Sequence, residues 1–250
     1  MNWHDEPPSP QGAVSEAGDR DAVTDAALRS VPDAEPYRPP PDDGLEPIHL
    51  DAAFVVLVKP AGLLSEPGRG DDKHDSLLAR ARARWPDVRI VHRLDMATSG
   101  VLVLARGALA HARLSAAFRE RRVTKGYEAL VHGPWLAAES PHVGEIDLPL
   151  AVDWPNRPRQ IVCHRTGKPS LTRYRVLDAG AQARVALAPV TGRTHQLRVH
   201  LAAWGRPIVG DPFYGRAGDR APRMMLHATA IAFEHPVTAV PCMFESAVPF

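Results

Sequence analysis

Short apolar runs alternate with polar turns from Ile48 to the end of the chain. Phe54–Val58 and Val101–Ala105 are the clearest runs, and both are too short and too rich in β-branched residues to be helices. We therefore predict a buried strand at each of them. Further strands are predicted at Tyr127–His132, Leu171–Leu177, Arg184–Pro189 and Ala228–Phe233.

Three segments have helical character instead. Ser76–Trp85 ends before Pro86, and Ala108–Arg122 offers an apolar side and a basic end. The third is predicted to begin at Thr194 as its N-cap and to run to Trp204, where a glycine follows. Many strands with few helices between them predict an α+β fold without regular βαβ alternation.

Residues 1–47 differ from the rest of the chain. They contain nine prolines and 11 acidic residues against three arginines. Such a composition cannot bury enough apolar surface to fold by itself. We expect a disordered or loosely attached extension over 1–47, in which the pattern permits one short helix at Ala22–Arg29, and a folded domain over 48–250.

The formal net charge of +1 hides an asymmetry between these two parts. The extension carries −8 and the body +9, so the body is basic. Only four of its basic residues are lysines. Arginine suits bidentate phosphate contacts and stacking on bases, which favours a nucleic acid as partner. A composition rich in arginine and alanine equally reflects a GC-rich genome, so composition alone does not establish that the partner is a nucleic acid.

Cysteine content and the N-terminus bear on the compartment. Cys163 and Cys242 are the two cysteines, too few for a disulfide framework. The N-terminus lacks a basic region followed by an apolar stretch, and no apolar segment approaches the length of a membrane span. We expect a soluble protein of the reducing cytoplasm, without a membrane partner. Nothing in the pattern demands an oligomer, so a monomer is expected.

The most informative motif is Val91–Gly100, which precedes the strand at Val101–Ala105. It places Asp95, with Arg93 two residues before it, in a turn held against a rigid strand. Such a carboxylate can act on an anionic substrate. Taken alone, an aspartate that caps its own turn explains the motif equally well.

A second motif is Thr191–Leu201. His195 and Arg198 are three residues apart and are expected to share one helix face. The helix N-terminus, with Arg193 beside it, can bind an anion. A solvated surface helix is the alternative explanation.

Two further segments combine basic and aromatic residues. In Val123–Val131, Lys125 and Tyr127 lie at the start of a predicted strand, where a tyrosine is usually a packing residue. Asp153–Gln160 joins a tryptophan to two arginines in a proline-rich loop, a mixture that suits unpaired RNA.

Several other chemistries lack their motifs. Gly68–Gly70 has neither the spacing nor the Lys-Ser/Thr pair of a phosphate-binding loop, and no dinucleotide fingerprint follows a strand. His195 and His200 have no accompanying zinc-ligand spacing, and there is no Gly-x-Ser-x-Gly elbow. One acid, several arginines and one tyrosine remain, without a metal or redox motif.

Over residues 48–250 the chain resembles the RluA family of pseudouridine synthases. The shared motifs are His92–Asp95 with Thr98–Gly100, Lys59–Leu63, Lys125–Tyr127, Gly192–Arg198, Gly210–Gly215 and Leu226–Ala228. Within the family, Asp153–Pro158 and the lack of an S4-type domain point to members that modify a tRNA anticodon stem-loop and a hairpin of large-subunit (23S) ribosomal RNA. Residues 1–47 and the Pro134–Gly144 loop lie outside this resemblance.

The resemblance implies a mixed, mostly antiparallel central sheet with an RNA-binding cleft and a reaction that needs neither cofactor nor metal. It implies that Asp95 is the essential carboxylate, as nucleophile or as base, with Arg198 as its partner and Tyr127 against the target uracil. Candidate RNA-binding residues are Arg93, His92, Thr98, Arg193, His195, Arg157, Arg159, Arg119, Arg121, Arg122 and Lys125.

Two other functions remain to be weighed. A protein of the same fold that binds RNA or assists ribosome assembly would need no chemistry, although Asp95, Tyr127 and Arg198 are all present. A glycosidic hydrolase built on Asp95 would need a second carboxylate, for which there is no clear candidate.

Overall fold

The computed structural model describes residues 36–136 and 141–250. In this part of the chain the strands are β1 (His49–Leu50), β2 (Phe54–Lys59), β3 (Val88–Ile90), β4 (Ser99–Arg106), β5 (Thr124–His132), β6 (Val143–Asp147), β7 (Leu150–Val152), β8 (Gln160–Val162), β9 (Leu171–Asp178), β10 (Gln182–Pro189), β11 (Leu226–Glu234) and β12 (Pro241–Glu245). The helices are α1 (Leu77–Arg84), α2 (Gly107–Arg119) and α3 (Gln196–Ala203).

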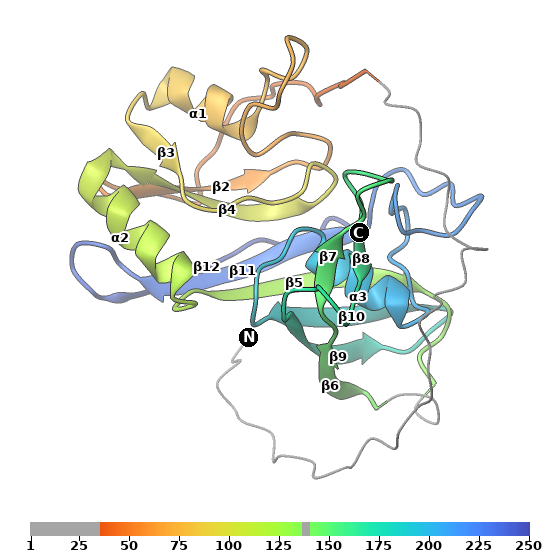
Figure 1. Ribbon diagram of the computed structural model, residues 1–250. Coiled ribbons are helices and arrows are strands. Elements are labelled where there is room, and N and C mark those ends of the chain that lie inside the picture. Colours follow the sequence, from red (N-terminus) through yellow and green to blue (C-terminus); the bar gives the residue numbers. More distant parts are fainter. Residues whose placement is uncertain (1–35, 137–140) are drawn as a thin grey trace.

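One ten-stranded sheet organises these elements (Figure 1). Its order is β1-β2-β4-β11-β5-β10-β9-β6, with β12 beside β11 and β3 beside β4. Among these pairs only β4 and β11 run parallel; the others are antiparallel. The predicted α+β class with a mixed, mostly antiparallel sheet is confirmed.

The strands predicted from apolar runs are all present. Successive side chains of a strand point to opposite faces of the sheet. In β2, Phe54 and Val56 therefore pack in the cluster of α2, while Val55 and Leu57 pack in the cluster of α1. A strand buried on both faces reads as a continuous apolar run, which is why β2 and β4 were detectable. The short strands β6, β8 and β12 expose alternate residues and were not predicted.

Two of the three helices match their predicted segments. Ser76 is the N-cap of α1, and its hydroxyl accepts a hydrogen bond from Ala79 N at 3.1 Å. Helix α2 ends at Arg119 instead of Arg122, because the chain turns at Arg121, which has a left-handed φ of 60°.

The predicted start of α3 was wrong. The N-cap is His195, with a left-handed φ of 55°, and not Thr194. This N-cap makes no side-chain hydrogen bond to the helix. The Gln196 side chain instead turns back to the preceding loop, where its Oε1 accepts from Arg193 N at 3.0 Å and from the Thr191 hydroxyl at 2.6 Å. His195 therefore precedes the helix that carries Arg198 and does not lie on its face.

Three apolar clusters fix the position of the helices. Helix α2 packs on one face of β2, β4 and β11, and α1 packs on the opposite face of β2 and β4. Helix α3 packs on β5 and β10, at the other end of the sheet from α1 and α2 (Figure 1). Tyr127 contacts both the α1 cluster and the α3 cluster. The centre of the sheet is thus the place where residues from α1, the turn before β4 and α3 can meet.

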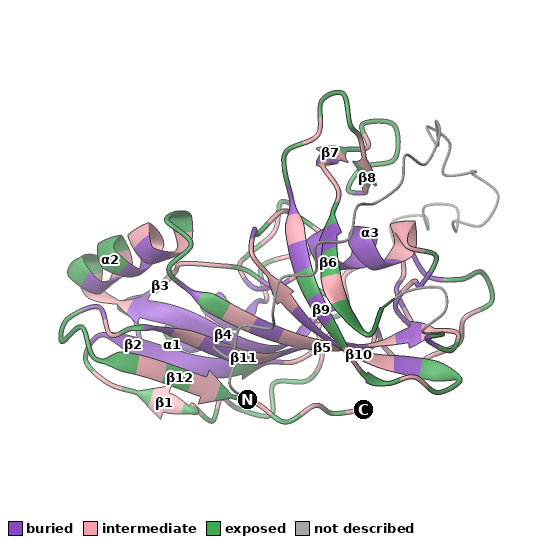
Figure 2. Ribbon diagram, turned by 90° about the horizontal axis from the view of Figure 1, so that it is seen from below, coloured by how far each residue is buried: buried purple, intermediate pink, exposed green. Residues whose placement is uncertain are grey.

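The β7–β8 pair forms a separate two-stranded sheet. Figure 2 shows it projecting away from the large sheet next to α3. Its connecting loop is Asp153–Arg159, in which Trp154 is 69% exposed. Arg157 lies over the Trp154 ring, 4.7 Å from its centroid.

Residues 36–47, which the sequence assigns to the extension, contact the domain. The Tyr37 hydroxyl donates to Asp75 O at 3.1 Å and accepts from Leu64 N at 3.0 Å. Arg80 of α1 donates to Pro40 O at 2.6 Å. Order therefore begins before Ile48, because carbonyls of the proline-rich segment accept from α1. The possible helix at 22–29 lies outside the described residues.

None of the helices in the described part of the chain is long and apolar enough to cross a membrane.

Candidate active site

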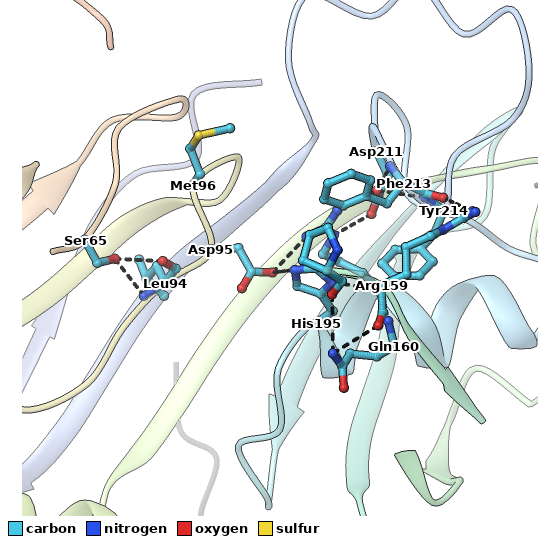
Figure 3. Close-up of polar contacts among 12 residues, drawn as sticks. Ser65, Leu94, Asp95, Met96, Arg159, Gln160, His195, Asp211, Phe213 and Tyr214 are labelled. Atoms are coloured by element: carbon cyan, nitrogen blue, oxygen red, sulfur yellow. Dashed lines mark hydrogen bonds and ion pairs between the residues drawn. The ribbon is translucent and has the colours of Figure 1, made fainter. Parts of the chain in front are cut away.

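Asp95 lies in the turn between β3 and β4, where the backbone is held by distant side chains. The turn closes through Thr98 N, which donates to Asp95 O at 3.0 Å. The Ser65 hydroxyl accepts from Leu94 N at 3.0 Å and donates to Leu94 O at 2.7 Å (Figure 3). The carboxylate itself is 28% exposed, so a substrate can reach it.

Lys59, at the end of β2, fixes the other side of this turn. It is fully buried, and its Nζ donates to Leu63 O at 2.7 Å, Pro60 O at 2.9 Å and Met96 O at 3.1 Å. Burial lowers the pKa of Lys59 to about 7, against the opposing effect of Asp95. The three carbonyl oxygens match the three N–H groups of an ammonium ion. Lys59 thus ties the turn of Asp95 to the end of β2.

Gly100 allows β4 to approach β11 immediately after the turn. Its φ is +121°, and a Cβ at this position would lie 2.2 Å from Ala228 O. No other residue fits there without moving the backbone. The sequence thus places a glycine where the turn of Asp95 meets the centre of the sheet.

Arg198 is the partner of Asp95, as predicted from the sequence. Its Nη1 donates to Asp95 Oδ2 at 3.0 Å, while Nε and Nη2 donate to the two oxygens of Asp211 at 2.7 and 2.8 Å. Burial acts to lower the pKa of Arg198, but the two carboxylates outweigh it and hold that pKa above its ordinary value. A permanently charged guanidinium therefore stands within hydrogen-bond distance of the Asp95 carboxylate.

Asp211 is fully buried and accepts two backbone hydrogen bonds besides those of Arg198. Phe213 N and Tyr214 N donate to its Oδ1 at 2.9 and 3.0 Å. Burial acts to raise the pKa of Asp211, but Arg198 and these amides hold it below its ordinary value. Asp211 thus fixes the plane of the guanidinium that contacts Asp95.

His195 lies close to the same carboxylate (Figure 3). Its Nε2 is 3.9 Å from Asp95 Oδ2, and its Nδ1 is 2.8 Å from the Tyr214 hydroxyl. The Tyr214 hydroxyl also accepts from Gln160 N at 2.8 Å. Burial, followed by Arg198, lowers the pKa of His195 to about 4, so the imidazole is neutral at pH 7.

Tyr127, on β5, is the third predicted catalytic residue. Burial, and to a smaller extent the charge of Asp95, hold the pKa of its hydroxyl well above the ordinary value. The Tyr127 hydroxyl is therefore neutral at pH 7. Its pKa responds to the charge of Asp95, the carboxylate that Arg198 contacts, so the three predicted catalytic residues lie near one another.

Most predicted RNA-binding residues lie at or near the surface. Arg93 is exposed and pairs with Glu66 at 2.7 Å. The other exposed candidates are Arg119, Arg121, Arg122 and Arg157, and the half-buried ones are Lys125, Arg193 and His195.

Three other candidates need correction, because Thr98 and Arg159 are buried and the ring of the partly exposed His92 is held by the protein. Val103 N donates to His92 Nε2 at 3.0 Å, and the ring stacks on Phe118 with centroids 4.5 Å apart. Thr98 is 3% exposed and Arg159 is 7% exposed. Arg159 donates to Phe213 O and lies over the Tyr214 ring. We reassign all three to the frame that holds the site.

Sequence reasoning missed four residues that build this site, namely Lys59, Ser65, Asp211 and Tyr214. Lys59, Asp211 and Tyr214 stand in motifs that the family resemblance quotes, but nothing local to those motifs indicates their partners. Asp211 is 13 residues from Arg198 in sequence, and Ser65 is 29 residues from Leu94. Only the folded chain brings them together.

No group of histidine, cysteine, aspartate and glutamate residues within 36–136 and 141–250 is placed to hold a metal ion.

Comparisons with known proteins agree on one family. The family model described as RNA pseudouridylate synthase matches residues 53–203. The dual-specificity RNA pseudouridine synthase RluA of Escherichia coli (strain K12) is 46% identical over 220 residues, covering 86% of this chain and 99% of that protein. RluA of Pasteurella multocida (strain Pm70) is 46% identical over 206 residues, covering 81% and 92%.

A solved structure agrees as well. Human RNA pseudouridylate synthase domain containing 1 superposes with a TM-score of 0.71 at 32% identity, covering 85% of this chain and 87% of that one.

Proposed function

Since this chain belongs to the RluA family of RNA pseudouridine synthases, we propose that its substrate is a uridine in a tRNA anticodon stem-loop, in a hairpin of 23S ribosomal RNA, or in both. Support comes from the relatives named dual-specificity enzymes, which match over nearly their whole length. The reaction breaks the glycosidic bond, turns the uracil and rejoins it through carbon 5. Atoms are conserved, so the reaction calls for neither a redox cofactor nor a donor of groups.

Asp95 is proposed to carry the reaction. The observation that supports it is the 3.0 Å bond from Arg198, a buried guanidinium that Asp211 holds in place, to a carboxylate that remains 28% exposed. An ionised, oriented and reachable carboxylate is what either mechanism requires. It can attack the ribose as a nucleophile or remove a proton from it as a base.

Tyr127 is proposed to pack against the target uracil. Its raised pKa means that the hydroxyl enters the reaction protonated. A direct role as the base that removes the carbon 5 proton would first require it to lose that proton at a cost. We therefore assign its ring to stacking and its hydroxyl to hydrogen bonding.

The target base must leave its stack before Asp95 can reach it, which costs a few kcal/mol and least for a loop nucleotide. Arg93 is two residues from Asp95 and exposed, so it is proposed to occupy the space that the base vacates. Its partner Glu66 is 34% exposed, and RNA phosphates can replace such a surface ion pair at little cost.

Two exposed groups are proposed to hold the rest of the RNA. Arg119, Arg121 and Arg122 lie at the end of α2 and suit backbone phosphates. Trp154 with Arg157, on the projecting β7–β8 loop, suits stacking on an unpaired base. Lys125 and Arg193 are proposed as further phosphate contacts.

We also propose that residues 48–250 form the catalytic domain, acting as a monomer in the cytoplasm, where tRNA and ribosomes are found. Sedimentation of the purified chain tests the monomer, and a concentration-dependent dimer would contradict it.

The decisive experiment combines an Asp95→Asn variant with pseudouridine mapping of total RNA. Cells that lack the protein are complemented with wild type, with Asp95→Asn or with Asp87→Asn. Asp87 is the matched control, because it is an exposed aspartate in an ion pair with Arg106. We expect wild type and Asp87→Asn to restore pseudouridine at an anticodon-loop uridine, a ribosomal hairpin uridine or both.

Asp95→Asn is expected to fold, to bind RNA and to restore no site. Substantial conversion by Asp95→Asn would remove Asp95 from the mechanism. Restoration at uridines of some other RNA class would keep the reaction and overturn the proposed substrates.

A further inference from the structure

His195 stands between the carboxylate of Asp95 and the hydroxyl of Tyr214. Its side chain is 9% exposed, and each ring nitrogen faces one of these groups (Figure 3). Nδ1 is 2.8 Å from the Tyr214 hydroxyl, and Nε2 is 3.9 Å from Asp95 Oδ2. A half-buried histidine so placed has little surface for RNA, although the sequence indicates an RNA contact.

The hydrogen-bond partners of Tyr214 determine which nitrogen of His195 carries the proton. Gln160 N is a backbone donor, so at 2.8 Å the Tyr214 hydroxyl can only accept from it. The proton of that hydroxyl is then left to donate to His195 Nδ1, its other partner among the described residues. Burial raises the pKa of Tyr214 to about 12, so the hydroxyl keeps this proton.

An imidazole that accepts at Nδ1 and is neutral must carry its proton at Nε2. That N–H faces Asp95 Oδ2, which already accepts from Arg198. The present 3.9 Å exceeds a hydrogen-bond distance by about 1 Å, so the Asp95 carboxylate has to move toward Nε2 in the reacting complex for this bond to form.

The backbone of His195 is also unusual. It has a φ of 55°, a left-handed conformation that L residues other than glycine rarely adopt. This conformation sets the imidazole ahead of α3, where the Phe213 ring stacks on it with centroids 5.8 Å apart. Such a conformation persists only where the surrounding structure holds it, and here the contacts of the ring with Tyr214 and Phe213 do so.

We propose that His195 is a positioning residue of the site, set by Tyr214 in the tautomer that donates from Nε2 to Asp95 in the reacting complex. The proposal rests on the proposed role of Asp95. Gln160 is the first residue of β8, so the loop end of the β7–β8 hairpin helps to define this tautomer. His195 then acts on the orientation of the carboxylate and not on RNA affinity.

The test uses Tyr214→Phe with Tyr174→Phe as its matched control. Tyr174 is also buried and donates its hydroxyl, to Pro141 O at 3.1 Å, away from Asp95. Long-range ¹H–¹⁵N NMR reports the tautomer of His195, whose signals are assigned by their loss in His195→Gln. Single-turnover conversion is measured on total RNA from cells that lack the protein. RNA affinity is measured at two salt concentrations.

In wild type we expect His195 to be protonated at Nε2 and bare at Nδ1. Tyr214→Phe should lose this signature and slow conversion by about tenfold, the effect of roughly one hydrogen bond, with RNA affinity unchanged. Tyr174→Phe should change neither the NMR signature of His195 nor the rate of conversion. His195→Gln, whose amide can still donate, should convert RNA faster than His195→Leu.

Three outcomes would overturn the proposal. They are an Nδ1-protonated His195 in wild type, an unchanged rate in Tyr214→Phe, and a salt-dependent loss of RNA affinity in His195→Leu that accounts for its slower conversion. Failure of wild type to convert any uridine would count against the proposed function instead, and the NMR spectra would still test the tautomer.

Discussion

Asp211 contributes to the site without facing the substrate. Its carboxylate accepts two hydrogen bonds from Arg198 and two from backbone amides while fully buried. Arg198 alone would be a buried cation facing only the partly exposed Asp95. Such a cation is costly unless it is paired, so Asp211 is needed for Arg198 to stay where Asp95 can use it.

We expect Asp211→Ala to lower the free energy of unfolding by about 3–5 kcal/mol, because it leaves the Arg198 charge buried with one of its three hydrogen bonds. Urea titration measures this loss. Asp87→Ala, which breaks an exposed ion pair, is the control and should cost less than about 1 kcal/mol. Equal losses in the two variants would show that Arg198 does not depend on Asp211.

Single residues were predictable where the signal was local. Asp95 stands out because an acid, a turn and a glycine occur within ten residues of a strand, and its partner Arg198 follows from the family motif. Asp211 and Lys59 gave no such signal, because their roles come from partners brought together by the fold. Arg159 was misplaced because an arginine in a polar loop gives no sign that its guanidinium turns inward to Phe213 O.

At the scale of elements, the strands that could be predicted from the sequence are the ones that the fold buries. Strands β2 and β4 are buried on both faces and were read correctly, whereas β6 and β12 are half-exposed and were missed. The start of α3 was misread because His195 is left-handed and the Gln196 side chain bonds back to Arg193 N in the preceding loop. Neither feature has a composition signal that propensity rules detect.

The segment 36–47, which the sequence assigns to a disordered or loosely attached extension, contacts α1, and two truncations define its contribution. Deleting residues 1–35 leaves the contacts of Tyr37 and Pro40 in place, and this chain is the reference. Deleting residues 1–47 removes them and should lower the free energy of unfolding by about 1–3 kcal/mol, as expected for a few net hydrogen bonds. Urea titration of both chains gives the difference. A 1–47 deletion as stable as the 1–35 deletion would mean that this segment only rests on α1.

At the scale of the whole molecule, the two halves of the sheet contribute different parts of the site. The β2–β4 half supplies Asp95 and its anchor Lys59, and the β5–β10 half supplies Arg198 through α3. Tyr127 lies where the two apolar clusters meet. Because Arg198 joins the halves through the partly exposed Asp95, the geometry of the carboxylate depends on both halves being folded.

Buried neutral histidines give this molecule a distinct response to acid. Burial lowers the pKa of His92 to about 3 and those of His195 and His227 to about 4. In the unfolded chain each takes up its proton near pH 6.5. Between pH 6.5 and 4 the unfolded state therefore binds more protons, and stability must fall as the pH is lowered through this window.

Each of these histidines should contribute up to about 1.4 kcal/mol per pH unit, so the three together give roughly 4 kcal/mol per pH unit near pH 5. Urea titrations at pH 6.5, 5.5 and 5.0 measure this slope before most carboxylates are protonated. His227→Gln should reduce it by up to about 1.4 kcal/mol per pH unit, because glutamine does not titrate and can still bond Ser99 and Ser246, the partners of His227. A free energy of unfolding that stays constant from pH 6.5 to 5.0 would mean that these imidazoles gain protons in the folded state, and His195 could not then be the neutral donor that Asp95 requires.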